Sequence, residues 1–136
     1  MASYELAFLQ ALSLTVLLEI IAAAALKHFA GRRLALEGTS YPRFIIMVAL
    51  ASALTLPYAW FILPAFVSRG LPYILTAEIS VTVIEALWYW FCLRPANDPQ
   101  TSKSTLQKNR AAAFTAAVIL SAVSNAFSYL VGNVIF

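Results

Sequence analysis

The sequence contains very little charge for its length. Only 11% of the 136 residues are Asp, Glu, Lys or Arg, whereas soluble domains carry about 25%. Hydrophobic residues make up 62% of the chain, and a soluble fold of this size could not bury so much apolar surface. The composition therefore indicates an integral membrane protein, and the length indicates a single domain over residues 1–136.

Cysteine and histidine are each present once. A single cysteine, Cys92, excludes an internal disulfide and a cysteine-based metal cluster. His28, likewise alone, excludes a histidine-rich metal site within one chain. No phosphate-binding glycine loop and no Ser–His pair is present, and we predict no cofactor. The formal net charge of +3 does not indicate nucleic-acid binding in so apolar a chain. We therefore expect no nucleic-acid partner.

What the sequence has instead is long apolar runs. Each is close to the ~20 residues that a helix needs to cross a ~30 Å hydrocarbon layer. No positive charge precedes the first run, so we expect a retained span rather than a cleaved signal peptide. Pro57 and Pro64 are expected to kink the second span. The sequence predicts an all-α bundle of four transmembrane helices, with spans at about 6–26, 44–67, 72–93 and 111–135.

The basic residues are distributed unevenly between the connections. Eight of the nine Lys and Arg residues fall in the segments 27–43 and 94–110, and Arg69 is the exception. Cytoplasmic loops are enriched in Lys and Arg. We therefore predict a multi-pass protein of the cell (inner) membrane, with both segments in the cytoplasm and both termini outside.

Three glutamates lie inside the predicted spans, where a charge at the bilayer centre costs at least ~2.5–3.5 kcal/mol. With ~1.5 Å of rise per residue, Glu19 and Glu85 lie ~12–14 Å from the cytoplasmic ends of their helices. Ser52 and Ser121 are expected at the same level. Glu78 is expected one to two turns further out.

A second polar level is expected around Glu78. Counting from the cytoplasmic ends places Asn125 and Tyr58 at that level, with Thr55 just below. A polar column through the bundle interior would satisfy all these groups. The predicted ion, proton or substrate site is Glu19, Glu78, Glu85, Asn125, Tyr58 and Thr55. The alternative is that these groups are hydrogen-bonded packing contacts between helices.

The segment 18–31, LEIIAAAALKHFAG, resembles the first helix of the small multidrug resistance transporters. Glu19 matches the membrane glutamate of that family, and Lys27 and Gly31 match the helix exit. The resemblance implies a four-helix proton-coupled antiporter whose glutamate binds a cation or a proton in alternation. The glycine-rich pattern of that family's third helix is missing here.

The whole-chain pattern resembles a group of uncharacterised four-span prokaryotic membrane proteins. The matching parts are Glu19 in the first span, the segment 55–64 in the second, Glu78 with Glu85 in the third and the segment 124–128 in the fourth. This resemblance implies a fold and no activity.

We favour a small transporter or channel, rather than an enzyme, that moves protons or cations. The expected partners are the lipid bilayer, further copies in a homo-oligomer, and a small cation or amphipathic substrate. One alternative is an intramembrane enzyme that acts on a lipid-like substrate. If this enzyme held a metal ion, the ligands would be Glu19, Glu78 and Glu85. Such an oxygen-only site would suit Mg²⁺, Mn²⁺ or Ca²⁺. The other alternative is a structural subunit of a larger complex.

Overall fold

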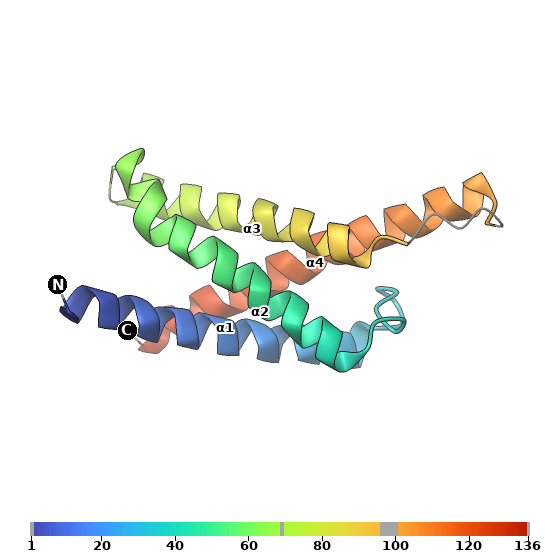
Figure 1. The fold of residues 1–136 in the computed structure, drawn as a ribbon, viewed down its shortest axis with the longest axis horizontal. Coiled ribbons are helices and arrows are strands. Elements are labelled where there is room, and N and C mark those ends of the chain that lie inside the picture. The colour runs from blue at the N-terminus through green and yellow to red at the C-terminus, as the bar shows by residue number, and fades with distance from the viewer. Residues whose placement is uncertain (1, 69, 96–100, 136) are drawn as a thin grey trace.

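The computed structural model describes residues 2–68, 70–95 and 101–135. Within these ranges, four helices are each long and apolar enough to cross a membrane. They are α1 (Ala2–Ala30), α2 (Tyr41–Pro57), α3 (Leu71–Leu93) and α4 (Lys103–Ile135) (Figure 1). The helices pack as a bundle, which confirms the predicted all-α class and identifies a multi-pass membrane protein.

The helices form a closed ring in which α1 and α3 each pack mainly against α2 and α4. Helix α4 runs diagonally: it begins beside α3 and ends beside α1 (Figure 1). Helix α2 crosses on the other side and joins α1 to α3. This arrangement leaves α1 and α3 facing each other across the bundle interior.

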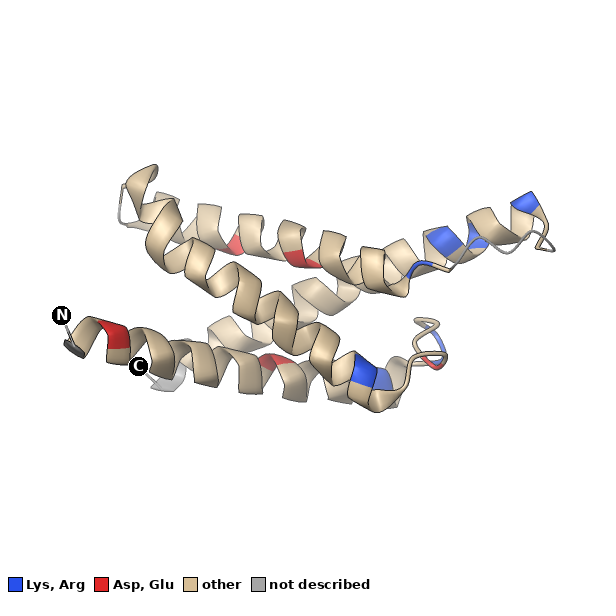
Figure 2. Ribbon diagram, viewed as in Figure 1, with Lys and Arg blue, Asp and Glu red and all other residues tan. Residues whose placement is uncertain are grey.

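Charge separates the two ends of the bundle. Lys and Arg gather where α1 ends, where α2 begins and along the first turns of α4, an end called the basic end below (Figure 2). Both chain termini lie at the opposite end, called the terminal end (Figure 1). Arg69, the basic residue expected away from the others, lies outside the described residues.

Helix α4 begins earlier than the predicted span. Its first turns, from Lys103 to Arg110, are helical and continuous with the membrane segment, whereas the predicted fourth span begins at residue 111. The Ser102 hydroxyl accepts a hydrogen bond from the backbone amide of Thr105 at 3.3 Å. A serine in this position satisfies an amide that has no partner within the helix.

The prolines of the second span interrupt its α-helical geometry, as expected. Helix α2 ends at Pro57 and continues as a π-helical turn, η1 (Tyr58–Ile62), and a 3₁₀ turn, η2 (Leu63–Ala65). Proline has no amide hydrogen to donate to the preceding turn. The backbone therefore changes its pitch at the terminal end of the bundle.

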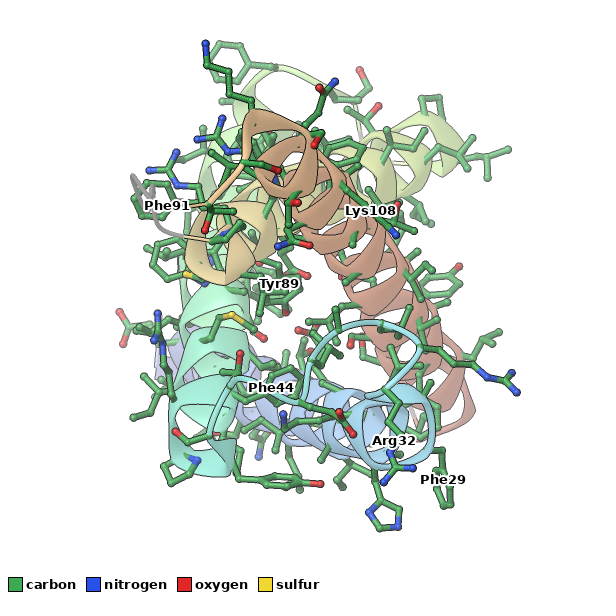
Figure 3. All side chains as sticks on the ribbon, turned by 90° about the vertical axis from the view of Figure 1, so that its right-hand side faces the viewer. Phe29, Arg32, Phe44, Tyr89, Phe91 and Lys108 are labelled. Atoms are coloured by element: carbon green, nitrogen blue, oxygen red, sulfur yellow. The ribbon has the colours of Figure 1, made fainter. Side chains whose placement is uncertain are left out.

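The buried apolar side chains concentrate towards the basic end. Figure 3 views the bundle from the basic end and shows that Tyr89 and Phe44 point into its interior. Alanines of α1, α2 and α4 let the helices approach closely. We call this cluster the apolar layer; it consists of Ala23, Leu36, Phe44, Met47, Val48, Ala51, Tyr89, Ala116, Ala117 and Leu120. The outer faces carry large exposed apolar side chains that contact lipid.

Candidate functional site

Two glutamates are buried in the middle of the bundle. The side chains of Glu19 on α1 and Glu85 on α3 are 1% and 0% exposed. The two carboxyl groups are near enough to interact electrostatically, although their helices contact each other little. The bundle thus brings two acids from opposite walls into each other's electrostatic range in its interior.

Helix α2 holds both acids with hydroxyl groups one turn apart. Ser52 donates a hydrogen bond to Oε2 of Glu19 at 2.5 Å, and Thr55 donates to Oε1 of Glu85 at 2.9 Å. Residues three apart lie on the same helix face. A single face of α2 therefore reaches the acids on both neighbouring helices.

Helix α4 does the same from the other side. Asn125 donates from Nδ2 to Oε2 of Glu85 at 2.5 Å, and Ser128 lies 3.5 Å from Oε1 of Glu19. Ser121 supports Asn125, whose Nδ2 also contacts the Ser121 carbonyl oxygen at 3.0 Å. Every carboxyl oxygen of the two acids thus has a partner. We call Glu19, Glu85, Ser52, Thr55, Asn125 and Ser128 the carboxyl network.

Each hydroxyl of the carboxyl network has a second acceptor within its own helix. The hydroxyl of Ser52 lies 3.2 Å from the carbonyl oxygen of Val48, and that of Thr55 lies 3.0 Å from the carbonyl oxygen of Ala51. A hydroxyl carries one proton but accepts as well as donates. It can donate to an ionised carboxylate, or turn to its backbone and accept from a protonated carboxyl. The network therefore accommodates both protonation states without moving a heavy atom.

A cavity of about 440 Å³ adjoins the carboxyl network on the side of the terminal end. Glu78 of α3 is half-buried in its wall. Aromatic side chains from three segments line it further: Trp60, Tyr73 and Tyr129. Glu19, Thr55, Asn125 and Ser128 also border it, and none of the described lining residues is Lys, Arg or His. The cavity is amphipathic, with acidic and aromatic walls.

Four of the six predicted site residues come together. Glu19, Glu85, Thr55 and Asn125 all belong to the carboxyl network. Glu78 lies outside this network but lines the adjoining cavity beside it and interacts electrostatically with both acids. The expected second level was wrong for Asn125, because its side chain bonds Glu85, which was expected one to two turns further in. Counting depth along each helix assumed parallel helices that end at one level, but α4 starts further out and crosses the bundle diagonally (Figure 1).

Tyr58 does not join this group. It opens the π-helical turn η1, is half-buried, and is not among the described residues that line the cavity. Tyr73 of α3 lines the cavity instead, and its hydroxyl donates to the carbonyl oxygen of Ala59 at 2.7 Å. Sequence spacing gave no signal for Tyr73, which lies near the helix end where tyrosines commonly serve as membrane-interface anchors.

Two buried hydroxyl groups have no hydrogen-bond partner within the part of the chain that the structure describes. They belong to Tyr89, one turn beyond Glu85 on α3, and to Ser124, next to Asn125 on α4. Tyr89 interacts electrostatically with Glu85 and Glu19. A buried unpaired hydroxyl is costly, so these two groups lower the stability of the bundle in this conformation.

The three membrane glutamates are not grouped as metal ligands in this structure. Among residues 2–68, 70–95 and 101–135, no group of three or more His, Cys, Asp or Glu side chains is placed to hold a metal ion. The set Glu19, Glu78 and Glu85, suggested from the sequence, is not such a group here, and a metal on these residues stays a prediction.

No protein-family model, curated protein or solved structure matches the chain. The comparisons thus identify no family, and the two resemblances in the sequence stay predictions. The four long apolar helices are those of a four-span membrane protein.

Proposed function

We propose that this protein moves protons or small cations across the membrane through the carboxyl network and its adjoining cavity. The observation that carries the proposal is the pair Glu19 and Glu85, fully buried in a membrane bundle and held by donors from both other helices. Ionisable groups inside a membrane are costly, and they commonly mark ion pathways or proton relays.

The local chemistry supports a proton-handling role. The hydroxyl groups of Ser52 and Thr55 each have a carboxyl and a backbone carbonyl within reach. Rotation of a hydroxyl therefore accompanies the gain or loss of a proton by Glu19 or Glu85. Glu78 in the cavity wall is the first acid that an ion from the terminal end would meet.

The apolar layer closes the route towards the basic end. It fills the interior beyond the carboxyl network with Phe44, Met47, Leu120 and their neighbours. We propose that transport alternates between this conformation and a second one in which the helices separate at the apolar layer. The buried hydroxyl of Tyr89 lies on that side and interacts electrostatically with both acids.

A coupled substrate belongs to the proposal as well. A cavity with acidic and aromatic walls suits a cation that carries an apolar body, since cations bind both carboxylates and aromatic faces. Trp60 and Tyr73 supply the rings, and Glu78 supplies the charge.

We further propose that the basic end lies in the cytoplasm, so that the cavity and both termini face outside. The support is the concentration of Lys and Arg at that end (Figure 2).

Single cysteines introduced at Thr39 and Ser68 of a Cys92→Ser variant test the orientation. An impermeant thiol reagent applied to intact cells should label the Ser68 position and spare the Thr39 position; the opposite pattern would reverse the assignment.

A homo-oligomer is the remaining element of the proposal. The outward faces of all four helices carry exposed apolar side chains such as Ile46, Ile79 and Leu130, which suit lipid or a second copy equally. Native mass spectrometry of the protein released from membranes decides between them. We expect a dimer or a larger species, and a monomer alone would refute the proposed homo-oligomer.

Proton flux into proteoliposomes after a pH jump tests the central proposal. The wild-type protein should acidify or alkalise the lumen faster than empty vesicles. The double variant Glu19→Gln/Glu85→Gln should reduce the flux to the empty-vesicle rate, because an amide cannot carry the proton. Glu5→Gln is the matched control, since Glu5 is an exposed acid of the same helix α1. Undiminished flux in the double variant would refute the proposal.

A further inference from the structure

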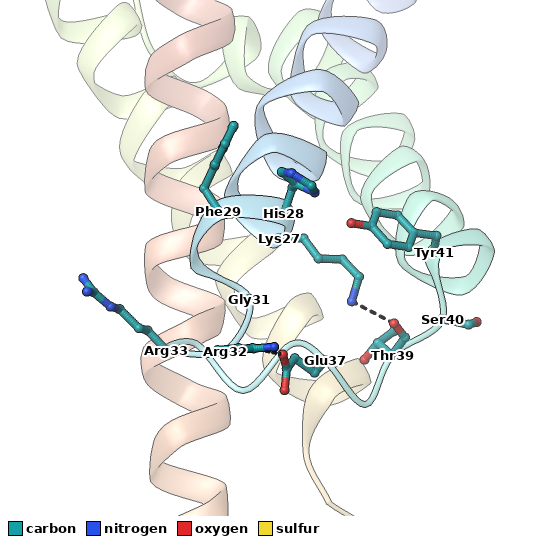
Figure 4. Close-up of a pocket in the computed structure, with 10 residues that line it drawn as sticks. All are labelled: Lys27, His28, Phe29, Gly31, Arg32, Arg33, Glu37, Thr39, Ser40 and Tyr41. Atoms are coloured by element: carbon teal, nitrogen blue, oxygen red, sulfur yellow. Dashed lines mark hydrogen bonds and ion pairs between the residues drawn. The ribbon is translucent and has the colours of Figure 1, made fainter.

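A second cavity, of about 660 Å³, lies at the basic end and is separate from the carboxyl network. It is formed where α1 ends, by the loop over residues 31–40 and by the start of α2 (Figure 4). We call it the basic pocket; its lining is Lys27, His28, Phe29, Gly31, Arg32, Arg33, Glu37, Thr39, Ser40 and Tyr41.

Positive charge predominates in the basic pocket. Lys27, Arg32 and Arg33 line it against one carboxylate among the described lining residues, Glu37. That carboxylate is engaged by Arg32, whose Nε donates to Oε1 of Glu37 at 3.0 Å. The remaining charge of Lys27 and Arg33 has no acidic partner in the described lining.

Lys27 is the central feature of the pocket. Its side chain is only 7% exposed and extends from α1 towards the loop (Figure 4). The ammonium donates to the carbonyl oxygens of Leu36 and, at 2.8 Å, of Thr39. It also lies 5.2 Å from the ring centroids of Tyr41 and Phe44. These partners orient the ammonium, but none of them carries a negative charge.

A largely buried cation without a counter-ion is unfavourable, and an anion placed beside it relieves the cost. The ammonium has three donors, and the two carbonyl oxygens use two of them. Lys27 also lies in the last turn of α1, directly after the predicted span of residues 6–26. The end of a membrane span is expected at the level of the phospholipid headgroups and their phosphates.

We propose that the basic pocket binds the phosphate group of an anionic phospholipid headgroup, with Lys27 as the principal ligand. Phe29, which is 84% exposed beside the pocket, lies alongside the acyl chains of the same lipid. The site stands on residues that the proposed transport function does not use, so either can fail without the other.

The experiment uses purified full-length protein in detergent micelles that contain equal amounts of phosphatidylglycerol and phosphatidylcholine with identical acyl chains. Native mass spectrometry counts the lipids that each protein molecule retains. One phosphatidylglycerol per chain should be retained in preference to phosphatidylcholine. Equal retention of the two lipids would overturn the proposal.

Three variants locate the site. Lys27→Gln should lower phosphatidylglycerol occupancy by about fivefold, the effect of one basic side chain near a membrane surface. Because Lys27 also holds the loop, Glu37→Gln provides a test that loss of folding cannot imitate: it removes the opposing carboxylate and should raise the affinity by about threefold. Lys108→Gln is the matched control, since Lys108 is an exposed basic residue across the basic end from Arg32 (Figure 3).

The source of the phosphate is distinguished in the same assay. Inorganic phosphate added at constant ionic strength should leave the retained phosphatidylglycerol in place if the lipid is the ligand. If inorganic phosphate displaces the lipid from the wild-type protein and has no such effect on Lys27→Gln, the pocket binds a soluble phosphate. That result would overturn the lipid assignment. Unchanged lipid occupancy in Glu37→Gln, or a loss in Lys108→Gln as large as in Lys27→Gln, would also overturn the site.

Discussion

The side-chain amide of Asn125 on α4 donates a hydrogen bond of 2.5 Å to the carboxyl group of Glu85 on α3, deep inside the bundle. Asn125 is 6% exposed and Glu85 is fully buried. The same carboxyl group accepts from Thr55 on α2. Three helices therefore meet at Glu85, and the consequences of removing each partner can be measured separately.

Replacing Asn125 should destabilise the bundle. Asn125→Leu leaves one carboxyl oxygen of Glu85 without its donor, and an unsatisfied buried acceptor costs about 1–3 kcal/mol. Thermal unfolding in detergent should show this loss of stability. The double variant Asn125→Leu/Glu85→Leu should recover part of the stability that Asn125→Leu loses. Strictly additive losses in this double-mutant cycle would contradict the contact, because interacting pairs couple by about 0.5–3 kcal/mol.

Thr55→Val should also destabilise, by about 1 kcal/mol, since valine keeps the shape of threonine and removes only its hydroxyl. The matched control is Thr115→Val on α4. Thr115 is exposed, and its hydroxyl donates to the carbonyl oxygen of Ala111 in the same way that Thr55 contacts Ala51. A loss of the same size in both variants would show that the bond to Glu85 adds nothing.

Tyr89, which is buried, and Tyr73, which is half-buried, should respond oppositely to loss of their hydroxyl groups. Tyr89→Phe removes a hydroxyl that has no partner among the described residues, so stability should hold or rise. Tyr73→Phe removes the 2.7 Å bond to the carbonyl oxygen of Ala59 and should cost about 1 kcal/mol. Unfolding temperatures of the two variants, compared with wild type, check the prediction. A marked loss in Tyr89→Phe would reveal a partner such as a bound water.

Glu78→Gln should separate transport from stability. Glu78 lies half-buried in the cavity wall rather than in the carboxyl network, so the substitution should leave the unfolding temperature close to wild type. Proton flux in the pH-jump assay should fall, because the first acid on the proposed route is gone. Full flux in Glu78→Gln would remove this residue from the route and leave Glu19 and Glu85 as its only acids among the described residues.

Gly31 should tolerate no side chain. A Cβ at this position would overlap the backbone carbonyl oxygen of Lys27, and overpacking of this kind costs about 1–3 kcal/mol. Gly38→Ala in the same loop is the control, because nothing lies within 4 Å of its added Cβ. Unfolding temperatures should fall for Gly31→Ala alone. Equal stability of the two variants would show that the end of α1 adjusts without cost.

The sequence alone determined the fold class and the segregation of charge. Apolar runs of membrane-spanning length leave the backbone no alternative to helices, and the basic residues 27–43 and 94–110 follow the ends of those runs. It also named Glu19, Glu85, Thr55 and Asn125, since a polar group within an apolar run is visible without any coordinates.

Only the tertiary structure decided which of these groups meet. Residue counting measures distance along one helix, whereas contact depends on tilt, crossing and rotation of all four. The diagonal path of α4 brings Asn125 to Glu85. Tyr73 lines the cavity, whereas Tyr58 at the start of the π-helical turn is not among the described lining residues. The position of Glu78 in the cavity wall, outside the carboxyl network, has the same origin, because packing between helices is a property of the whole bundle.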